Sequence, residues 1–145
     1  MNTFEKMLFL KSMSLFKYVK DDVLLGLAPL LEEQIVKAGE LIIKKGDLGT
    51  IMYLIVTGQV KVHDGERIVK EMGDHEVFGE LSALSPEIRI ASVTALEETL
   101  LLKIGNSVLE DLMEMEPALS KGIIQVLCQR TRSIASDLNQ LMSSQ

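Results

Sequence analysis

The stretch that decides the fold reads VFGELSALSPEIRIASV and runs from Val77 to Val93. It lies in a segment that otherwise consists of short β-type runs, yet Glu80 to Leu84 has the composition of a helical turn. Gly79 precedes this turn, and Ser85-Pro86 ends it before a new strand that we expect to begin near Arg89. A helix start leaves backbone N–H groups free, and these favour an anion. The stretch therefore predicts an anion site inside a β fold.

Two charged side chains stand nine residues apart in this stretch. Arg89 carries a planar guanidinium that can bind two phosphate oxygens, and Glu80 offers a carboxylate that can accept from a sugar hydroxyl. Gly79 lets the backbone approach a ligand closely. A phosphate beside a sugar hydroxyl describes a nucleotide, which is the ligand that these residues predict.

Outward from the stretch, the period of the apolar residues divides the chain into three zones. The spacing is helical over about 4–33, changes to short Val- and Ile-rich runs between turn residues over about 34–104, and is helical again over about 107–142. No repeat or low-complexity linker interrupts the chain, so we expect one domain over residues 1–145. Many short strands at turn spacings of about 8 to 12 residues predict a sandwich or jelly roll.

Several local signals refine this picture. Asp21-Asp22 is expected as the N-cap and first turn of a second helix, and Pro117 as part of the first turn of the last one. Asp64-Gly65 predicts a type I′ hairpin turn. The runs that read as successive strands around it are 52–56, 60–63 and 68–72.

Composition excludes several classes of protein. Of the 145 residues, 47% are hydrophobic and 25% are charged, so disorder is excluded. The net charge of -6 argues against a protein that binds nucleic acid through its phosphates. No apolar run approaches the roughly 18 residues of a spanning helix, so we expect a soluble chain without membrane insertion. The single cysteine, Cys128, predicts a reducing compartment, the cytoplasm, and we expect its thiol to be packed.

The central stretch resembles the phosphate-binding cassette of the cyclic nucleotide-binding domain family. The family pattern is Phe-Gly-Glu, then Leu or Ile, then small and apolar residues, and an Arg followed by a small residue, Ala, Ser or Thr, and Val. Phe78 to Ser82 and Arg89 to Val93 fit this pattern. The glycine-marked turns around residues 38–60 and the opening helical segment are also similar to the family, so the resemblance covers about Leu8 to Met142. It implies a mainly β jelly roll between N-terminal helices and a C-terminal lid helix.

The resemblance also implies roles for individual residues. Arg89 would neutralise the cyclic phosphate, and Glu80 would bind the ribose 2′-hydroxyl. Guanine-preferring members often carry Thr where this chain has Ile90, so cAMP is favoured over cGMP as the ligand. A second departure from the family pattern is Ala83, which stands where the family usually has a larger apolar residue. No cofactor beyond the ligand is implied. The full set of expected ligand-binding residues is Phe78, Gly79, Glu80, Leu81, Ser82, Arg89, Ile90 and Ala91, with the N–H groups of Leu81, Ser82 and Ala91 completing the phosphate cradle.

In this family the last helix folds over the base and in many members pairs with its mate. A homodimer through that helix is therefore a candidate assembly. Core packing is expected to explain most of the Leu127, Ile134 and Leu141 spacing. The candidates for contact with the base are Arg130, Thr131, Ser133 and Ile134.

Two alternatives remain beside this cytoplasmic, bacterial-type signal-transduction sensor. One is a degenerate domain that keeps the fold for protein interaction or dimerisation and has lost the ligand. The other, less favoured, is a cupin-like metal-dependent enzyme, which needs several converging ligands. The chain offers only His63 and His75, of which His75 is expected in a solvated turn, and Cys128 has no neighbouring His. We therefore expect no enzyme, and the effector stays open.

Overall fold

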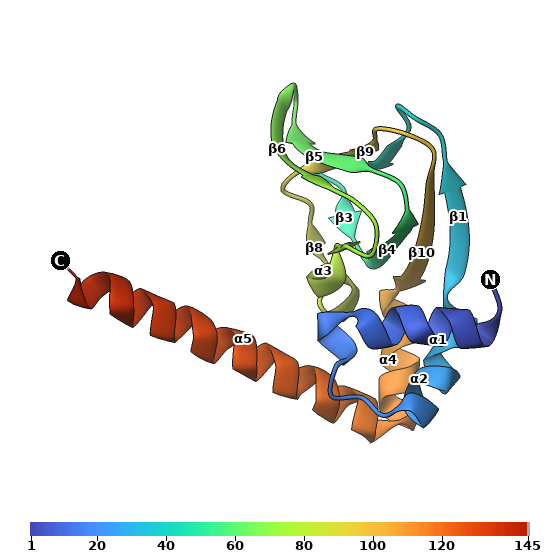
Figure 1. The fold of residues 1–145 in the computed structure, drawn as a ribbon, viewed down its shortest axis with the longest axis vertical. Helices are drawn as coiled ribbons and strands as arrows, with labels where there is room; N and C mark the ends of the chain where they lie inside the picture. Colours follow the sequence, from blue (N-terminus) through green and yellow to red (C-terminus); the bar gives the residue numbers. More distant parts are fainter. Residues whose placement is uncertain (145) are drawn as a thin grey trace.

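The structure is a computed structural model that describes residues 1–144. Figure 1 shows a β-roll that stands on a layer of helices, from which one long helix projects. The helices are α1 (Thr3–Ser12), α2 (Asp21–Leu27), α3 (Glu80–Leu84), α4 (Asn106–Met115) and α5 (Pro117–Ser143), with 3-10 turns η1 (Ser14–Phe16) and η2 (Ala28–Leu30). The strands are β1 (Glu32–Val36), β2 (Leu41–Ile43), β3 (Leu48–Gly49), β4 (Ile51–Thr57), β5 (Val60–Asp64), β6 (Arg67–Met72), β7 (Val77–Phe78), β8 (Glu87–Ile88), β9 (Ser92–Ala95) and β10 (Thr99–Gly105). The predicted fold class, a mainly β fold with flanking helices, is confirmed.

Two four-stranded antiparallel sheets form the β-roll. Their strand orders are β1-β10-β4-β7 and β2-β9-β5-β6, and β3 pairs with β8 in a small ribbon. Neighbouring strands are often distant in the sequence, since β4 pairs with β10 and β5 pairs with β9. Such pairing between distant strands of two facing sheets is the arrangement of a jelly roll.

The strand β4 is buried on both faces, which explains its continuous apolar run. Successive side chains of a strand point to opposite faces. Met52, Leu54 and Val56 pack with the helices, whereas Tyr53 and Ile55 pack inside the β-roll. The first sheet is therefore the middle layer, between the helices and the second sheet.

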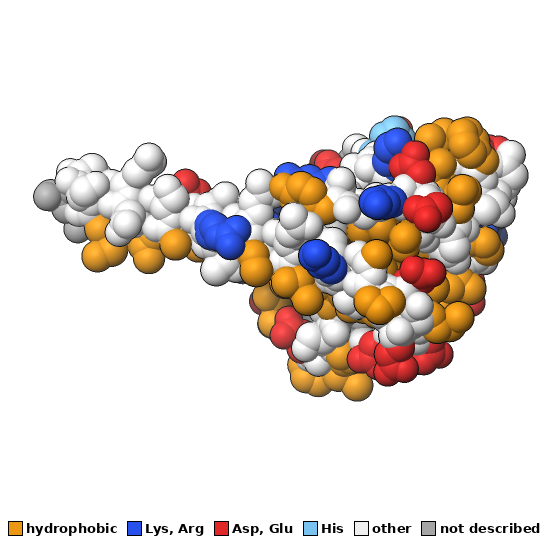
Figure 2. Space-filling model, turned by 90° about the horizontal axis from the view of Figure 1, so that it is seen from below, with side chains coloured by type: hydrophobic (Ala, Val, Ile, Leu, Met, Phe, Trp, Pro, Cys, Tyr) orange, Lys and Arg blue, Asp and Glu red, His pale blue; other side chains and the backbone are white. Residues whose placement is uncertain are grey.

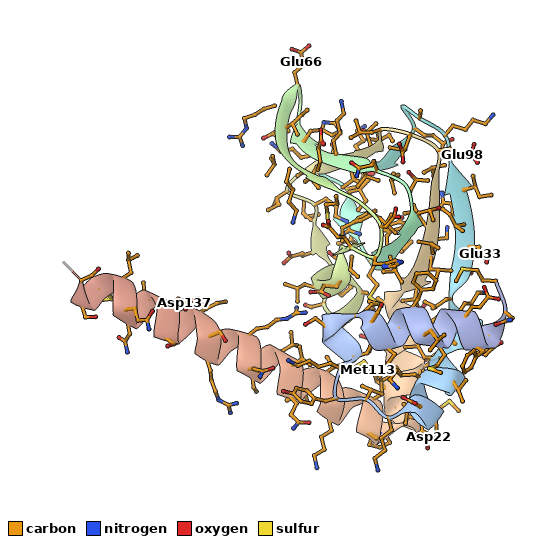
Figure 3. All side chains as sticks on the ribbon, viewed as in Figure 1. Asp22, Glu33, Glu66, Glu98, Met113 and Asp137 are labelled. Carbon is orange, nitrogen blue, oxygen red and sulfur yellow. The ribbon has the colours of Figure 1, made fainter. Side chains whose placement is uncertain are left out.

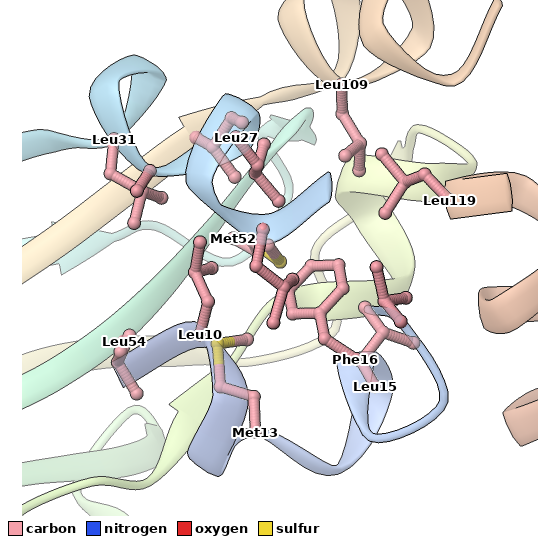
Figure 4. Close-up of a cluster of buried hydrophobic side chains, with 14 of the residues drawn as sticks. Leu10, Met13, Leu15, Phe16, Leu27, Leu31, Met52, Leu54, Leu109 and Leu119 are labelled. Atoms are coloured by element: carbon pink, nitrogen blue, oxygen red, sulfur yellow. The ribbon is translucent and has the colours of Figure 1, made fainter. Parts of the chain in front are cut away.

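The helical layer is held together by an apolar cluster that joins both ends of the chain (Figure 4). Leu10 of α1, Phe16 of η1 and Leu27 of α2 are fully buried there, together with Leu109 of α4 and Leu119 of α5. Because these elements come from the first and last zones of the sequence, the cluster fixes the start of α5 beneath the β-roll.

Two local predictions are wrong in detail. The α2 helix begins at Asp21 with Lys20 at its N-cap, so both aspartates lie in the first turn, where they still favour the positive end of the helix dipole. The hairpin between β5 and β6 is confirmed, but its loop residues are Gly65 and Glu66, at the tip seen in Figure 3. Only Gly65 of these two has a positive φ, +59°, whereas a type I′ turn needs two.

The helix α5 starts at Pro117, as predicted, and packs only through its first part. Its buried residues are Leu119, Gly122, Ile123 and Val126. A Cβ on Gly122 would lie 2.8 Å from Cγ2 of Val19, so the helix crosses the N-terminal segment closely at this glycine. Beyond that crossing the helix projects from the body, and Asp137 lies on the projecting part (Figures 1 and 3).

The projecting part of α5 carries exposed apolar side chains along one edge (Figure 2). Ile134, Leu138 and Leu141 are 68%, 54% and 62% exposed, so the expectation that core packing explains their spacing is wrong. The Cys128 thiol is also exposed, contrary to the expected packed thiol. Within residues 1–144, no helix has both the length and the apolar content to cross a membrane.

Candidate functional site

A cavity of about 370 Å³ opens between α3 and the second sheet. All the residues predicted to bind the ligand line this cavity, namely Phe78, Gly79, Glu80, Leu81, Ser82, Arg89, Ile90 and Ala91. The other lining residues are Ile43, Val62, Lys70, Met72, Val77, Glu87 and Val93. The fold thus brings the two ends of the central stretch to one place.

Lys70 and Glu87 are polar lining residues that the sequence reasoning missed. Met72 is buried at the end of β6, and Lys70 lies two residues earlier on the same face of the strand, opposite Val62 of β5. Strand alternation from Met72 was therefore a usable signal for Lys70. Glu87 lies in β8, close to Arg89 in the sequence.

The start of α3 is built around Gly79. This residue has a φ of +74°, and a Cβ on it would lie 2.8 Å from both the Ile51 carbonyl oxygen and Nη1 of Arg89. The preceding Phe78 stacks on Tyr53 of β4, with the ring centroids 5.0 Å apart. The N–H groups of the first helical turn have no intrahelical acceptor, and the residues of that turn line the cavity.

Arg89 lies in the connection between β8 and β9. The strand expected to begin near Arg89 begins three residues later, at Ser92. The backbone N–H of Arg89 donates to the Asp47 carbonyl at 2.8 Å, and its own carbonyl accepts from the Gly46 N–H at 2.9 Å. These two bonds tie the connection to the turn before β3. The backbone of Arg89 is thus fixed although it is not part of a sheet.

The Arg89 side chain lies in a narrow slot. Nη1 donates to Ser82 Oγ at 2.9 Å, and Nη2 donates to the Ile51 carbonyl at 2.6 Å. The slot walls are Gly49 and Gly79, because a Cβ on either glycine would collide with the guanidinium. We call this feature, formed by Gly49, Gly79 and Arg89, the arginine slot.

The guanidinium of Arg89 has no acidic partner. Within residues 1–144, no carboxylate lies within 4.0 Å of it. Burial lowers the pKa of Arg89, while the Tyr53 phenol and the Glu87 carboxylate act in the opposite direction. A half-buried cation without a counter-ion is costly unless an anion joins it. The arrangement therefore favours an anion in the cavity.

Glu80 is paired with the last helix. Arg130 of α5 donates from Nη1 to Glu80 Oε1 at 2.5 Å, and its Nη2 lies 3.4 Å from Ser14 Oγ. The two charged side chains are 24% and 34% exposed. This ion pair connects the first residue of α3 to α5 and leaves Oε2 of the carboxylate for another donor.

The other candidate lid residues lie elsewhere. Ser133 and Ile134 line a separate groove of about 530 Å³ between α5 and η1, together with Arg130, while Thr131 faces the opposite side of the helix. None of these four residues lines the 370 Å³ cavity. In this structure α5 therefore touches the site only through Arg130 and does not cover it.

The two histidines belong to the β-roll surface. His63 contacts the Gly65 carbonyl through Nδ1 at 2.8 Å and Thr94 Oγ1 through Nε2 at 2.7 Å. His75 is in an exposed turn, with a φ of 68° and its ring edge against Phe9. Residues 1–144 contain no group of three His, Cys, Asp or Glu side chains placed to hold a metal ion.

Comparison with known proteins shows the family of the chain that forms this cavity. The sequence pattern named Cyclic nucleotide-binding domain matches residues 33–116, more than half of the chain. The chain belongs to the cyclic nucleotide-binding domain family. The matched segment contains β1 except Glu32, all of β2 to β10, and every predicted cassette residue, whereas the candidate lid residues of α5 lie beyond it.

Relatives of this cyclic nucleotide-binding domain occur in kinases and in transcriptional regulators. Human cGMP-dependent protein kinase 2 is 33% identical over 95 residues, which cover 61% of this chain and 12% of the kinase. A CRP-like cAMP-activated global transcriptional regulator of Mycobacterium tuberculosis is 27% identical over 133 residues, 88% of this chain and 59% of the regulator. The chain thus spans only part of these curated relatives.

A solved structure confirms the architecture. The N-terminal domain of a transcriptional regulator from Streptomyces coelicolor A3(2) superposes with a TM-score of 0.82 at 27% identity, over 87% of this chain and 94% of that one. The family is a regulatory one in which the cyclic nucleotide-binding domain itself is typically non-enzymatic, and kinase activity in some relatives belongs to separate domains.

Proposed function

We propose that this domain senses cAMP by binding it in the 370 Å³ cavity. The observation that carries the proposal is the arginine slot, because it presents an unpaired guanidinium to a cavity that also holds the start of α3. Arg89 would bind two phosphate oxygens at once. The N–H groups of Leu81, Ser82 and Ala91 complete the phosphate contacts.

Glu80 supplies the sugar contact in this proposal. Arg130 holds Oε1, which leaves Oε2 to accept a hydrogen bond from the ribose 2′-hydroxyl. A hydrogen bond to a charged group contributes about 1.5–3 kcal/mol. Arg130 thereby orients the carboxylate and connects the sugar to α5.

The choice of base rests on Ile90 and Lys70. Ile90 is 86% exposed and has no hydroxyl for a guanine amino group, which favours cAMP. Lys70, however, brings an ammonium donor to the cavity, and guanine offers O6 and N7 as acceptors for such a donor. cGMP is therefore the second candidate, and relatives named for each nucleotide occur among the curated proteins.

Ligand binding would close the site. The phosphate draws Phe78 to Leu84 inward, and α5 shifts from an open to a closed population. The ligand can shift this equilibrium only by the ratio of its affinities for the closed and the open state. The Glu80–Arg130 pair supports this coupling, since it already joins α3 to α5.

A second copy of the chain is the proposed partner of α5. A row of positions along α5 follows a spacing of alternating three and four residues, and all of them are exposed except Leu127, which is partly buried. We call this row the α5 seam; it comprises Ile124, Leu127, Thr131, Ile134, Leu138 and Leu141. Such spacing is that of a two-stranded coiled coil. A parallel pairing of two α5 helices would cover the seam.

We propose that this domain binds its cyclic nucleotide in the cytoplasm and catalyses no reaction. A degenerate domain without ligand is the alternative, but the unpaired Arg89 in a half-buried slot argues against it. The effector that reads the state of α5 stays open.

A nuclear magnetic resonance titration tests the proposed site. In ¹H–¹⁵N spectra, cAMP should shift the amide signals of Gly79, Leu81, Ser82 and Ala91, and 5′-AMP should shift them less because its phosphate is not cyclic. The exposed hairpin residue Glu66 serves as an internal control that should not move. Absence of any shift at millimolar cAMP or cGMP would favour the degenerate alternative.

A further inference from the structure

Asn106, the first residue of α4, donates hydrogen bonds to two separate parts of the site. Its backbone N–H donates to the Thr50 carbonyl at 2.7 Å. Its side-chain Nδ2 donates to the Ala83 carbonyl of α3, also at 2.7 Å. Within residues 1–144 this is the one side-chain hydrogen bond that joins α3 to α4. Asn106 therefore connects α3 both to the segment before β4 and to the C-terminal helices.

Arg89 also joins the start of β4 to α3, through the residues next to those that Asn106 contacts. Its guanidinium binds Ile51, which follows Thr50, and Ser82, which precedes Ala83. Thr50, just before β4, and Ile51, its first residue, are thus connected through Asn106 and Arg89 to two neighbouring residues of α3. The two links and the backbone between them form a closed ring.

The two links differ in their exposure to the cavity. The guanidinium of Arg89 and Ser82 both line it, so phosphate oxygens compete with Ser82 Oγ for the guanidinium N–H groups. A bond from the guanidinium to an anionic oxygen is stronger than one to a neutral hydroxyl. Asn106 and Ala83 do not line the cavity, and Ala83 is fully buried. A ligand therefore reaches the first link and leaves the second in place.

We propose that Asn106 is a positioning residue that keeps α3 attached to α4 while Arg89 exchanges Ser82 for the phosphate. Movement of α3 then passes through Asn106 to α4 and on to α5, which starts two residues after α4 ends. This inference rests on the proposed function and deepens it, since it names the route by which the same site is read out.

The variant Asn106→Asp tests this role with little change of shape. It replaces the Nδ2 donor by a carboxylate oxygen, which repels the Ala83 carbonyl, while a carboxylate in the first turn of α4 is favourable for that helix. Asn106→Ser removes the bond without adding charge and covers the case in which the first variant does not fold. Asn2→Asp is the matched control, because Asn2 caps α1 by accepting from the Glu5 N–H, which a carboxylate also does.

Hydrogen exchange in the free protein gives the first measurement. The Ser85 amide donates to the Leu81 carbonyl at the end of α3, so its exchange reports the opening of that helix. We expect this amide to exchange at least about fivefold faster in both Asn106 variants, with no change in Asn2→Asp. Unchanged exchange in both variants would overturn the positioning role without any ligand being involved.

A fluorescent label on α5 gives the second measurement. In a Cys128→Ser, Ser136→Cys background, the label sits on an exposed position away from the α5 seam. At saturating cAMP the signal change should fall below about half of the parent value in both Asn106 variants and be kept in Asn2→Asp. A full signal change in both variants would overturn the coupling route. If calorimetry detects no nucleotide binding by the parent chain, the proposed function fails, and the coupling route fails with it. The hydrogen-exchange measurement still decides whether Asn106 positions α3, because it uses the free protein.

Discussion

At the scale of single residues, the two glycines of the arginine slot decide where the Arg89 charge is held. Gly79 allows the left-handed backbone that starts α3, and Gly49 has no side chain where the guanidinium passes. The side chain of Arg89 is therefore held by shape as well as by its bonds to Ser82 and Ile51. Any group added to the slot displaces the cation from the cavity wall.

Gly49→Ala should damage the site by filling the slot. The added Cβ collides with Arg89, so we expect the free energy of unfolding to fall by about 1–3 kcal/mol and the affinity for cAMP to fall at least about tenfold. Chemical denaturation and calorimetry measure the two effects.

Gly26→Ala is the matched control for that substitution. Gly26 lies in α2, and a Cβ there meets no atom within 4 Å. Replacing a helical glycine by alanine should stabilise the chain by about 0.5–1 kcal/mol and leave binding unchanged. If Gly49→Ala behaved like Gly26→Ala, the slot would not position Arg89.

Sequence reasoning reached some of these residues and missed others for a physical reason. Glu80 and Arg89 could be predicted because they stand close together in one unusual stretch. Gly49 lies 40 positions before Arg89, and only the fold brings the two together. Asn106 likewise acts through a contact with Ala83 that no local pattern encodes.

At the scale of elements, α5 has two faces with different partners. One face packs on the N-terminal segment and carries Arg130 toward Glu80. The α5 seam lies beside it and is exposed except at Leu127. The helix can therefore pair with a second copy and contact the cassette in the same state.

Ile134→Glu combined with Leu138→Glu should break the proposed homodimer. Burying each apolar side chain contributes about 1.5–3 kcal/mol, so two buried charges should raise the dimer dissociation constant by about a hundredfold or more. Sedimentation equilibrium measures this change. Ser136→Glu adds a charge to the same helix away from the seam and should leave the constant unchanged; a parent chain that is monomeric at all concentrations would contradict the pairing.

Arg130→Ala should weaken ligand binding through Glu80. Without its partner the carboxylate loses a charge-assisted bond that orients it, so we expect the affinity for cAMP to fall about threefold to tenfold. Lys17→Ala removes a cation from the same groove without touching Glu80, and it should bind like the parent chain. Equal affinities of the two variants in calorimetry would show that Arg130 does not orient the carboxylate.

The element boundaries were largely predictable, but the state of α5 was not. Pro117 marked the helix start, and short apolar runs between turn residues placed β4 to β6. The helical spacing of Ile134 and Leu141 predicts an apolar edge on α5, but it does not say what covers that edge. In the structure, no element of residues 1–144 covers it. The thiol of Cys128 was misjudged for the same reason.

At the scale of the whole molecule, three layers place the site. The helical cluster fixes α5 under the first sheet, and the second sheet with α3 encloses the cavity. The alternation between β-type and helical periods was enough to predict this order of zones, since it depends on the averaged pattern of many residues. The cavity itself depends on how the sheets close, which the averaged pattern does not describe.

Ligand binding should stabilise the whole fold. A ligand that binds only the folded state at a hundred times its dissociation constant adds about 2.7 kcal/mol to the free energy of unfolding. Thermal unfolding with saturating cAMP should therefore show a clear rise in Tm. Arg89→Ala should show a clearly smaller rise at the same cAMP concentration, because a tenfold weaker affinity lowers the added stability by about 1.3 kcal/mol. An equal rise in both proteins would mean that the ligand binds elsewhere.

The most direct measurement is isothermal titration calorimetry of the chain with cAMP and with cGMP, on wild type, Arg89→Ala and Arg89→Lys. We predict one site per chain in the wild type, tighter binding of cAMP than of cGMP, and an affinity at least about tenfold lower in both variants, because a lysine cannot reproduce the two-pronged contact. Arg67→Lys, on the exposed hairpin, should bind like the wild type. Wild type that binds neither nucleotide, or Arg89→Lys that binds as tightly as the wild type, would contradict the proposed role of the arginine slot.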